Sequence, residues 1–151
     1  MTSKKIDARF IIFTAQDAFP GRDWLRISYD AIEKDDSGLL GFNDGKWQGR
    51  IASFGMVRKE WIQKFYNNEI LNSSYRSHKA DNEITVIAKL DASYIYCPQS
   101  VLIEVDYNKD SGGSNALDDS VFAERFNSGF NFFPMEEIET YRKEYKVKAN
   151  V

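Results

Sequence analysis

Two carboxylates in the second half of the chain have the spacing that a metal-dependent hydrolase needs. Glu104 and Asp106 lie two residues apart in a β-favouring segment, so both would project from one face of a strand. Paired carboxylates bind the metal ions that activate water in nucleases. The sequence shows no third ligand at a matching spacing, although His78 could assist. We therefore expect a solvated strand face, and keep a small hydrolase or nuclease as an alternative function.

The segment that begins at Asp106 also has the spacing of the first half of a calcium-binding loop. Asp106, Asn108 and Asp110 place oxygen atoms at alternate positions. An EF-hand loop needs glycine at its sixth position and glutamate at its twelfth, and this sequence has Ser111 and Leu117 there. The segment therefore indicates an ordinary polar turn, and we expect no metal.

The single cysteine and the single histidine limit the chemistry further. Cys97 has no partner for an internal disulfide, and with His78 it cannot complete a four-ligand zinc site. A nucleophile and base pair would be one route to catalysis. However, Cys97 follows Tyr-Ile-Tyr, where cysteine usually serves as a small buried apolar residue. The chain also lacks a phosphate-binding loop, a Rossmann glycine pattern and a Gly-x-Ser-x-Gly motif. We expect no cofactor and no catalysis by this pair.

A basic and aromatic stretch between Lys46 and Lys64 raises the question of nucleic acid. It holds five bases and one acid, with Trp47 and Trp61 between them. Cations that reach phosphates and rings that stack on bases are typical of single-strand binding. The whole chain nevertheless carries a net charge of -3, and Trp61 and Phe65 have the spacing of core residues on a helix. Nucleic acid is therefore not the partner that we expect.

Aromatic residues near the C-terminal end provide the best candidate for a contact surface. Phe126, Phe130 and Phe132, together with Phe133, surround a connection rich in glycine and asparagine. No regular period turns all these rings inward, so a surplus on the surface would form a patch suited to a protein partner. The alternative is that the rings close one end of the core.

Acidic residues precede these rings. Glu104 to Asp119 contains five acids and one base, Lys109. Such a cluster would steer the protein towards a basic partner, while the rings would supply the buried anchors. The predicted partner-binding residues are Asp106, Asp110, Asp118, Asp119, Phe126, Phe130 and Phe132.

Several segments that would position these residues have β character. Phe10-Ile11-Ile12-Phe13, within Ile6 to Ala15, predicts a central strand covered on both faces. Trp24 to Glu33 fits two templates, because Leu25, Ile27, Tyr29 and Ala31 alternate as in a strand, whereas Leu25, Tyr29 and Ile32 would line a helix. The alternation is the cleaner pattern, so we predict a strand.

The middle of the chain predicts more sheet. Glu83 to Leu90 and Ser100 to Asn108 alternate apolar and polar residues, and Tyr94 to Cys97 adds a β-favouring segment ended by Pro98. Asn43-Asp44-Gly45 predicts a short hairpin, since Asp-Gly accepts the positive φ angles of tight turns.

Three segments predict helices. Val57 to Leu71 carries apolar residues at four-residue spacing, ending near Asn72. Asp118 to Asn127 follows a capping residue, Asp119 or Ser120, and ends at Ser128-Gly129. Pro134 opens the last helix, whose early glutamates and late bases suit its dipole.

Length and composition set the architecture. With 151 residues, 42% of them hydrophobic and 28% charged, the chain can bury a sizeable core without disulfides. Helices and strands do not alternate regularly, which favours an α+β fold. We predict a single globular domain over residues 1–151: an antiparallel or mixed sheet with two or three helices packed mainly on one face.

The same features suggest where and how the protein works. No apolar run is long enough for a membrane span, and Met1 to Arg9 lacks the apolar stretch of a secretory signal, so we expect a cytoplasmic protein. A small, mildly acidic, aromatic-rich chain without catalytic motifs is typical of inhibitor and immunity proteins that cover a toxin or enzyme. We therefore expect a non-catalytic protein-binding module. The alternatives are the carboxylate enzyme above and a subunit of a phage or secretion assembly.

Overall fold

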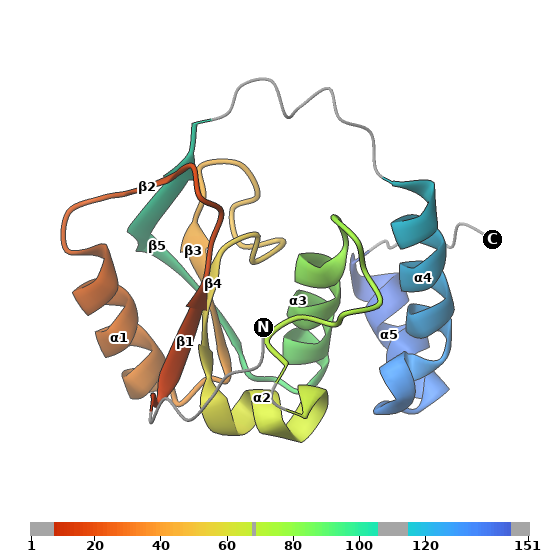
Figure 1. The fold of residues 1–151 in the computed structure, drawn as a ribbon. Coiled ribbons are helices and arrows are strands. Elements are labelled where there is room, and N and C mark those ends of the chain that lie inside the picture. Colours follow the sequence, from red (N-terminus) through yellow and green to blue (C-terminus); the bar gives the residue numbers. More distant parts are fainter. Residues whose placement is uncertain (1–7, 68, 106–114, 146–151) are drawn as a thin grey trace.

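The computed structural model describes residues 8–67, 69–105 and 115–145. Its strands are β1 (Phe10–Phe13), β2 (Ala18–Pro20), β3 (Leu39–Asn43), β4 (Gly55–Arg58) and β5 (Tyr94–Glu104). They form one five-stranded sheet in the order β1-β4-β3-β5-β2 (Figure 1). Only β3 and β5 run parallel, and the other neighbours are antiparallel. The sheet is therefore mixed.

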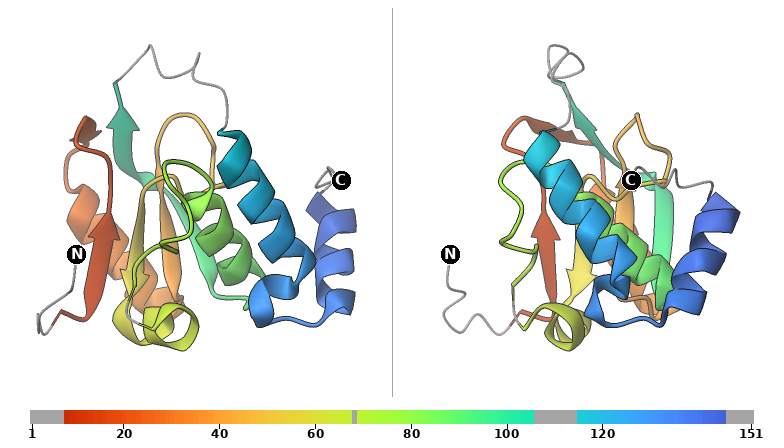
Figure 2. Two further views of the ribbon diagram at one scale, coloured as in Figure 1. Left: turned by 45° about the vertical axis from the view of Figure 1, so that its right-hand side comes forward. Right: turned by 90° about the vertical axis from the view of Figure 1, so that its right-hand side faces the viewer.

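Helices cover both faces of the sheet unequally. The helical elements are α1 (Trp24–Asp35), α2 (Lys59–Tyr66), α3 (Ala80–Leu90), α4 (Ala116–Asn127), the short 3-10 helix η2 (Gly129–Asn131) and α5 (Met135–Tyr145). Helix α1 lies alone on one face, against β3 and β5. The other helices lie on the opposite side, where α4 and α5 form an outer layer beyond α3 (Figures 1 and 2). The predicted α+β class, with helices mainly on one face, is confirmed.

The alternation of side chains along the strands divides the core into two clusters. Leu39 and Leu40 are adjacent and both fully buried, but Leu39 packs among α2 to α5 whereas Leu40 packs under α1. This follows from the period of two in a strand. Cys97 belongs to the α1 cluster, as a small buried apolar residue does.

The predicted helices are present with shorter or shifted bounds. Helix α2 ends at Tyr66, because Asn67 adopts the left-handed conformation that terminates it. Helix α4 is capped by Asn115, whose side chain accepts a hydrogen bond from the Leu117 amide, and not by Asp119 or Ser120. Helix α5 begins directly after Pro134, as predicted.

Two predicted strands are helices, which corrects the sequence analysis and raises the number of helices above two or three. Trp24 to Glu33 lies in α1, whose buried residues Ser28 and Ile32 are four apart. Glu83 to Leu90 lies in α3, where every residue from Glu83 to Ala88 is buried. A helix enclosed on all sides shows no polar face, so an apparent alternation carries no information about its period.

The strand predictions also need three corrections. The sheet order places β1 at an edge and not at the centre, although its side chains pack on both faces. Residues 44–54 join β3 and β4 through a long loop, where Asp44 accepts hydrogen bonds from the Lys46 and Trp47 amides instead of closing a tight hairpin. Strand β5 continues through Pro98, because a register shift opposite Phe42 and Asn43 accommodates it.

Candidate binding surface

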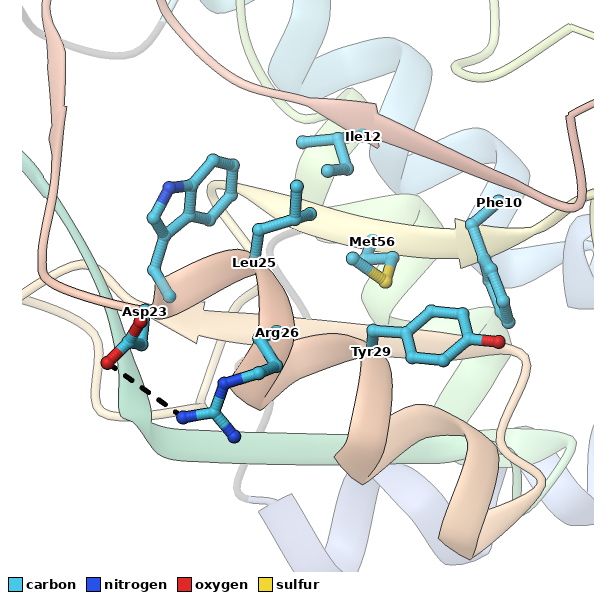
Figure 3. Close-up of a pocket in the computed structure, with 8 residues that line it drawn as sticks. Phe10, Ile12, Asp23, Leu25, Arg26, Tyr29 and Met56 are labelled. Carbon is cyan, nitrogen blue, oxygen red and sulfur yellow. Dashed lines mark ion pairs between the residues drawn. The ribbon is translucent and has the colours of Figure 1, made fainter.

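An open groove of about 680 Å³ lies between α1 and the edge strand β1 (Figure 3). Its apolar lining comes from both elements and from β4. The lining residues are Phe10 and Ile12 of β1, Met56 of β4, and Trp24, Leu25 and Tyr29 of α1, with Asp23 and Arg26 beside them. The groove is therefore an apolar hollow with charged groups at its rim.

The placement of α1 explains why this groove is open. The helix buries its Ser28 and Ile32 face against β3 and β5, which leaves β1 and β4 less covered. Leu25 and Tyr29 are consequently 49% and 45% exposed. At one end the Tyr29 ring meets the Phe10 ring edge-to-face at 5.7 Å between centroids. This contact closes the groove near the middle of α1.

Charged groups at the rim pair loosely with one another. Arg26 lies 3.8 Å from Asp23 and 3.6 Å from Asp30, and all three side chains are more than half exposed. Exposed pairs of this kind contribute about 0–1 kcal/mol. The rim therefore carries both signs, in contacts that cost little to break.

Towards the C-terminal end of α1 the ionic contacts are tighter. Glu33 is held by Arg9 at 2.8 Å and by Arg58 at 3.1 Å, and both guanidinium groups lie over the Phe10 ring. Arg58 is largely buried and also donates to the backbone carbonyl of Ile32. This cluster fixes the C-terminal half of α1 to β1 and β4.

The predicted acidic contact residues separate into different environments. Asp106 and Asp110 lie outside the described residues. Asp118 is buried on α4, and it accepts hydrogen bonds from the amides of Arg76, Ser77 and His78. These backbone donors, that of Arg76 foremost, hold the pKa of Asp118 at about 2, below its ordinary 3.8. Its carboxylate therefore fastens the loop before α3 to α4.

Asp119 differs from its neighbour. It lies at the surface and pairs with Lys79 at 3.1 Å. The predicted rings also divide: Phe126 and Phe130 are buried and contact each other edge-to-face, whereas Phe132 is 44% exposed. Phe126 and Phe130 thus close one end of the core, as the alternative interpretation held. Asp119 and Phe132 are the predicted contact residues that lie at the described surface.

The other chemical candidates are not brought together. Cys97 packs under α1, while His78 lies before α3, which stands on the opposite face of the sheet. Glu104 ends β5, and its predicted partner Asp106 lies outside the described residues. Within the described ranges, no group of three or more His, Cys, Asp or Glu residues could hold a metal ion. In the same ranges, no helix is long and apolar enough to cross a membrane.

The basic and aromatic stretch is dispersed by folding. Trp61 is buried and donates its indole N–H to Asp91, which also accepts from Lys64. Trp47 stays near the surface, but Lys46 and Arg50 both lie over its ring at 5.5 Å from the centroid. The cations and rings of this stretch therefore mainly contact one another or acids of the same chain.

A buried ionic network, unforeseen from the sequence, joins four parts of the fold. Glu83 is fully buried on α3, and its carboxylate accepts from Arg125 at 2.6 and 2.9 Å, Tyr75 at 2.7 Å, Asn72 at 3.1 Å and Tyr66 at 3.2 Å. Burial first, and Glu83 second, raise the pKa of Tyr66, so its hydroxyl stays a donor. All five donors point at one carboxylate, which leaves it saturated. We therefore assign this network to stability.

Sequence reasoning missed the groove because it placed Leu25 and Tyr29 on a strand. The helical spacing of Leu25, Tyr29 and Ile32 was the available signal, but Leu25 and Tyr29 then lie beside the buried stripe instead of on it. Phe10 and Ile12 appeared as residues of a central strand.

Comparisons with models of protein families, with curated proteins and with solved structures give no match for the chain.

Proposed function

We propose that the protein is a non-catalytic protein-binding module, and that the groove between α1 and β1 is its main contact surface. The observation that supports this proposal is the apolar groove itself, with Leu25 and Tyr29 about half exposed beside Phe10 and Ile12. Apolar hollows with charged rims are typical of surfaces that receive the apolar anchor residues of a partner.

The free energy that such a contact can contribute follows from the exposed apolar side chains of the groove. Fully burying a large apolar side chain contributes about 1.5–3 kcal/mol. Leu25 and Tyr29 are already half buried, so covering both would contribute roughly 2 kcal/mol in total, in addition to the gain from the partner's own anchor. The loose pairs that Arg26 makes with Asp23 and Asp30 can be exchanged for ionic contacts with the partner.

We further propose that the module is of the inhibitor or immunity type and acts in the cytoplasm by covering a toxin or enzyme. The unpaired cysteine, Cys97, is compatible with a reducing compartment. Asp119, in the first turn of α4, would make a separate contact on the other side of the sheet and favour a basic partner. Phe132, beyond the opposite end of α4, would make another.

The test is affinity capture with matched variants. The full chain, its double variant Leu25→Glu/Tyr29→Glu and a control, Leu117→Glu, serve as bait in a lysate of cells that carry this sequence. Leu117 is 56% exposed on α4, so the control replaces an exposed apolar residue by glutamate at a site away from the groove. We expect a stoichiometric partner whose affinity falls on the order of tenfold or more in the double variant and stays unchanged in the control.

Two outcomes would contradict the proposal. A partner retained equally by all three baits would move the contact surface away from the groove. A protein that captures nothing would favour the enzyme alternative, and a metal and nuclease screen of the full chain, with Glu104→Gln as comparison, would then follow.

A further inference from the structure

We propose that the edge of β1 pairs with the β1 edge of a second copy of the chain, which joins two sheets into one of ten strands. This inference does not require the proposed partner in the groove, although Phe10 and Ile12 belong to both surfaces. It rests on the direction of the backbone groups of β1, on the lack of protection along this edge within the described residues, and on the symmetry of the β1 sequence.

The hydrogen-bond register shows which backbone groups of β1 point outward. Phe10 to Phe13 pair with Arg58 to Gly55, and the Lys59 amide donates to the Arg9 carbonyl at 3.0 Å. In an antiparallel pair, hydrogen-bonded residues alternate along the strand. Arg9, Ile11 and Phe13 therefore face β4, and the N–H and C=O groups of Phe10 and Ile12 face the open edge.

The ladder on the far side of β4 agrees with this assignment. The Arg58 amide donates to Gly38, and the Phe42 amide donates to Phe54, so the even-numbered residues of β4 face β3. Val57 and Gly55 then face Ile11 and Phe13. Among the described residues, the sheet has no strand beyond β1 (Figure 2).

The two edges of the sheet differ in protection. Strand β2, at the other edge, has three residues and ends in Pro20, which lacks an amide hydrogen. Strand β1 consists of Phe-Ile-Ile-Phe, with no charge, proline or bulge. Natural sheets usually protect a free edge by such devices, since an unprotected apolar edge is a template for pairing. Beyond β2, the same side of the sheet is formed by β5, whose pairing is interrupted by Pro98 and a register shift. Two-fold pairing uses the β1 edge of both copies, so the assembly closes at two copies.

The sequence of β1 suits a two-fold axis. With Ile11 opposite Ile11 of the second copy, Phe10 of each copy faces Ile12 of the other, and these pairs exchange four backbone hydrogen bonds. The side chains of Phe10 and Ile12 then meet on the α1 face, and those of Ile11 on the opposite face. The Arg9 residues of the two copies stay about 14 Å apart, which exceeds the screening length at physiological salt.

The extent of this contact predicts a weak dimer. A standard interface buries about 800 Å² on each partner, and two four-residue strands bury less. We therefore expect a dissociation constant on the order of tens of micromolar. A second copy fits better than an unrelated strand for two reasons. This register gives hydrogen-bond partners to the outward backbone N–H and C=O groups of Phe10 and Ile12 in each chain, and it places apolar side chains opposite apolar ones.

The first test is sedimentation velocity of the full chain from about 1 to 300 µM. We expect the mass to rise from 17.4 kDa towards twice that value. Ile12→Pro removes an outward N–H and no hydrogen bond to β4, so it should weaken self-association on the order of tenfold or more while the protein stays folded. The matched control Leu25→Glu changes the groove but not the edge, and it should leave self-association unchanged.

A second measurement needs no variant and applies even where Ile12→Pro fails to fold. Amide hydrogen exchange of Phe10 and Ile12 should slow on the order of tenfold between dilute and concentrated protein, whereas Ile11, already bonded to β4, should show no such change. A mass of 17.4 kDa at every concentration would overturn the proposal and leave the edge to a foreign strand. A dimer lost in Leu25→Glu would overturn it as well, because the groove would then be the interface.

Discussion

Replacing Glu83 by glutamine is expected to destabilise the fold strongly, although the side chain keeps its shape. Glu83 is fully buried, and one of its oxygens accepts from Tyr75 and the Arg125 Nε, while the other accepts from Arg125 Nη2, Asn72 and Tyr66. Glutamine has only one acceptor oxygen. Its NH2 group must therefore replace one of the two carboxylate oxygens of Glu83, where it faces hydrogen-bond donors. Tyr75 can turn to accept a hydrogen bond, but the Arg125 Nε–H cannot.

The magnitude follows from the charge that remains. Glutamine leaves the Arg125 guanidinium without its counter-ion, and breaking a buried ion pair from one side costs about 3–5 kcal/mol. Arg125 retains some exposure, with 23% of its side chain accessible, which places the expected cost near the lower limit. A domain of this size is stable by about 5–15 kcal/mol, so the variant should still fold. The midpoint of thermal unfolding should fall by roughly 6–12 °C.

The assay is urea unfolding followed by tryptophan fluorescence and far-UV circular dichroism. Glu139→Gln is the matched control, because Glu139 pairs with Arg142 at the surface and its loss should cost less than about 1 kcal/mol. Arg125→Met in the Glu83→Gln background should cost less than the sum of the two single changes, since both remove the same contact. Equal free energies of unfolding for Glu83→Gln and Glu139→Gln would refute the reasoning.

Two further predictions concern pH. Backbone amides lower the pKa of Asp118 to about 2, so its stabilising effect should be complete above pH 4 and be lost as the pH falls towards 2. The free energies of unfolding of the wild type and Asp118→Asn should therefore converge at low pH, and a constant difference between them would contradict the assignment. Burial raises the pKa of Tyr66, Tyr75, Tyr94 and Tyr141 above the ordinary 10.0, so the stability that these side chains confer is present below pH 10 and decreases at higher pH. Absorbance at 295 nm should show these tyrosines ionising together with unfolding, and their ionisation in the folded state would contradict this prediction.

Local signals in the sequence predicted some elements correctly, and particular residues show why. Trp61, Ile62, Phe65 and Tyr66 repeat at helical spacing, and all four are buried in α2. Pro134 specifies the start of α5 through the chemistry of its own backbone. The absence of a regular alternation between predicted helices and strands indicated the α+β class. These signals act within a few residues, so the chain context does not overrule them.

Trp24 to Glu33 and Glu83 to Leu90 show where sequence reasoning fails. Both segments fit a period of two and a period near 3.6, and burial decides between them. Helix α3 is enclosed between the sheet and the outer helices, so neither face is polar enough to reveal its period. The choice between strand and helix was therefore made by packing that involves distant parts of the chain.

The candidate surfaces depend on tertiary structure even more. The sequence by itself determined which side chains were available: apolar residues in Phe10 to Phe13, rings near Phe126, and acids near Asp118. It could not determine that β1 would be an edge, that α1 would leave Leu25 and Tyr29 half exposed, or that Asp118 would be enclosed by backbone amides. Strand order and helix placement arise from contacts between residues far apart in sequence, and exposure is a property of those contacts and not of residue type.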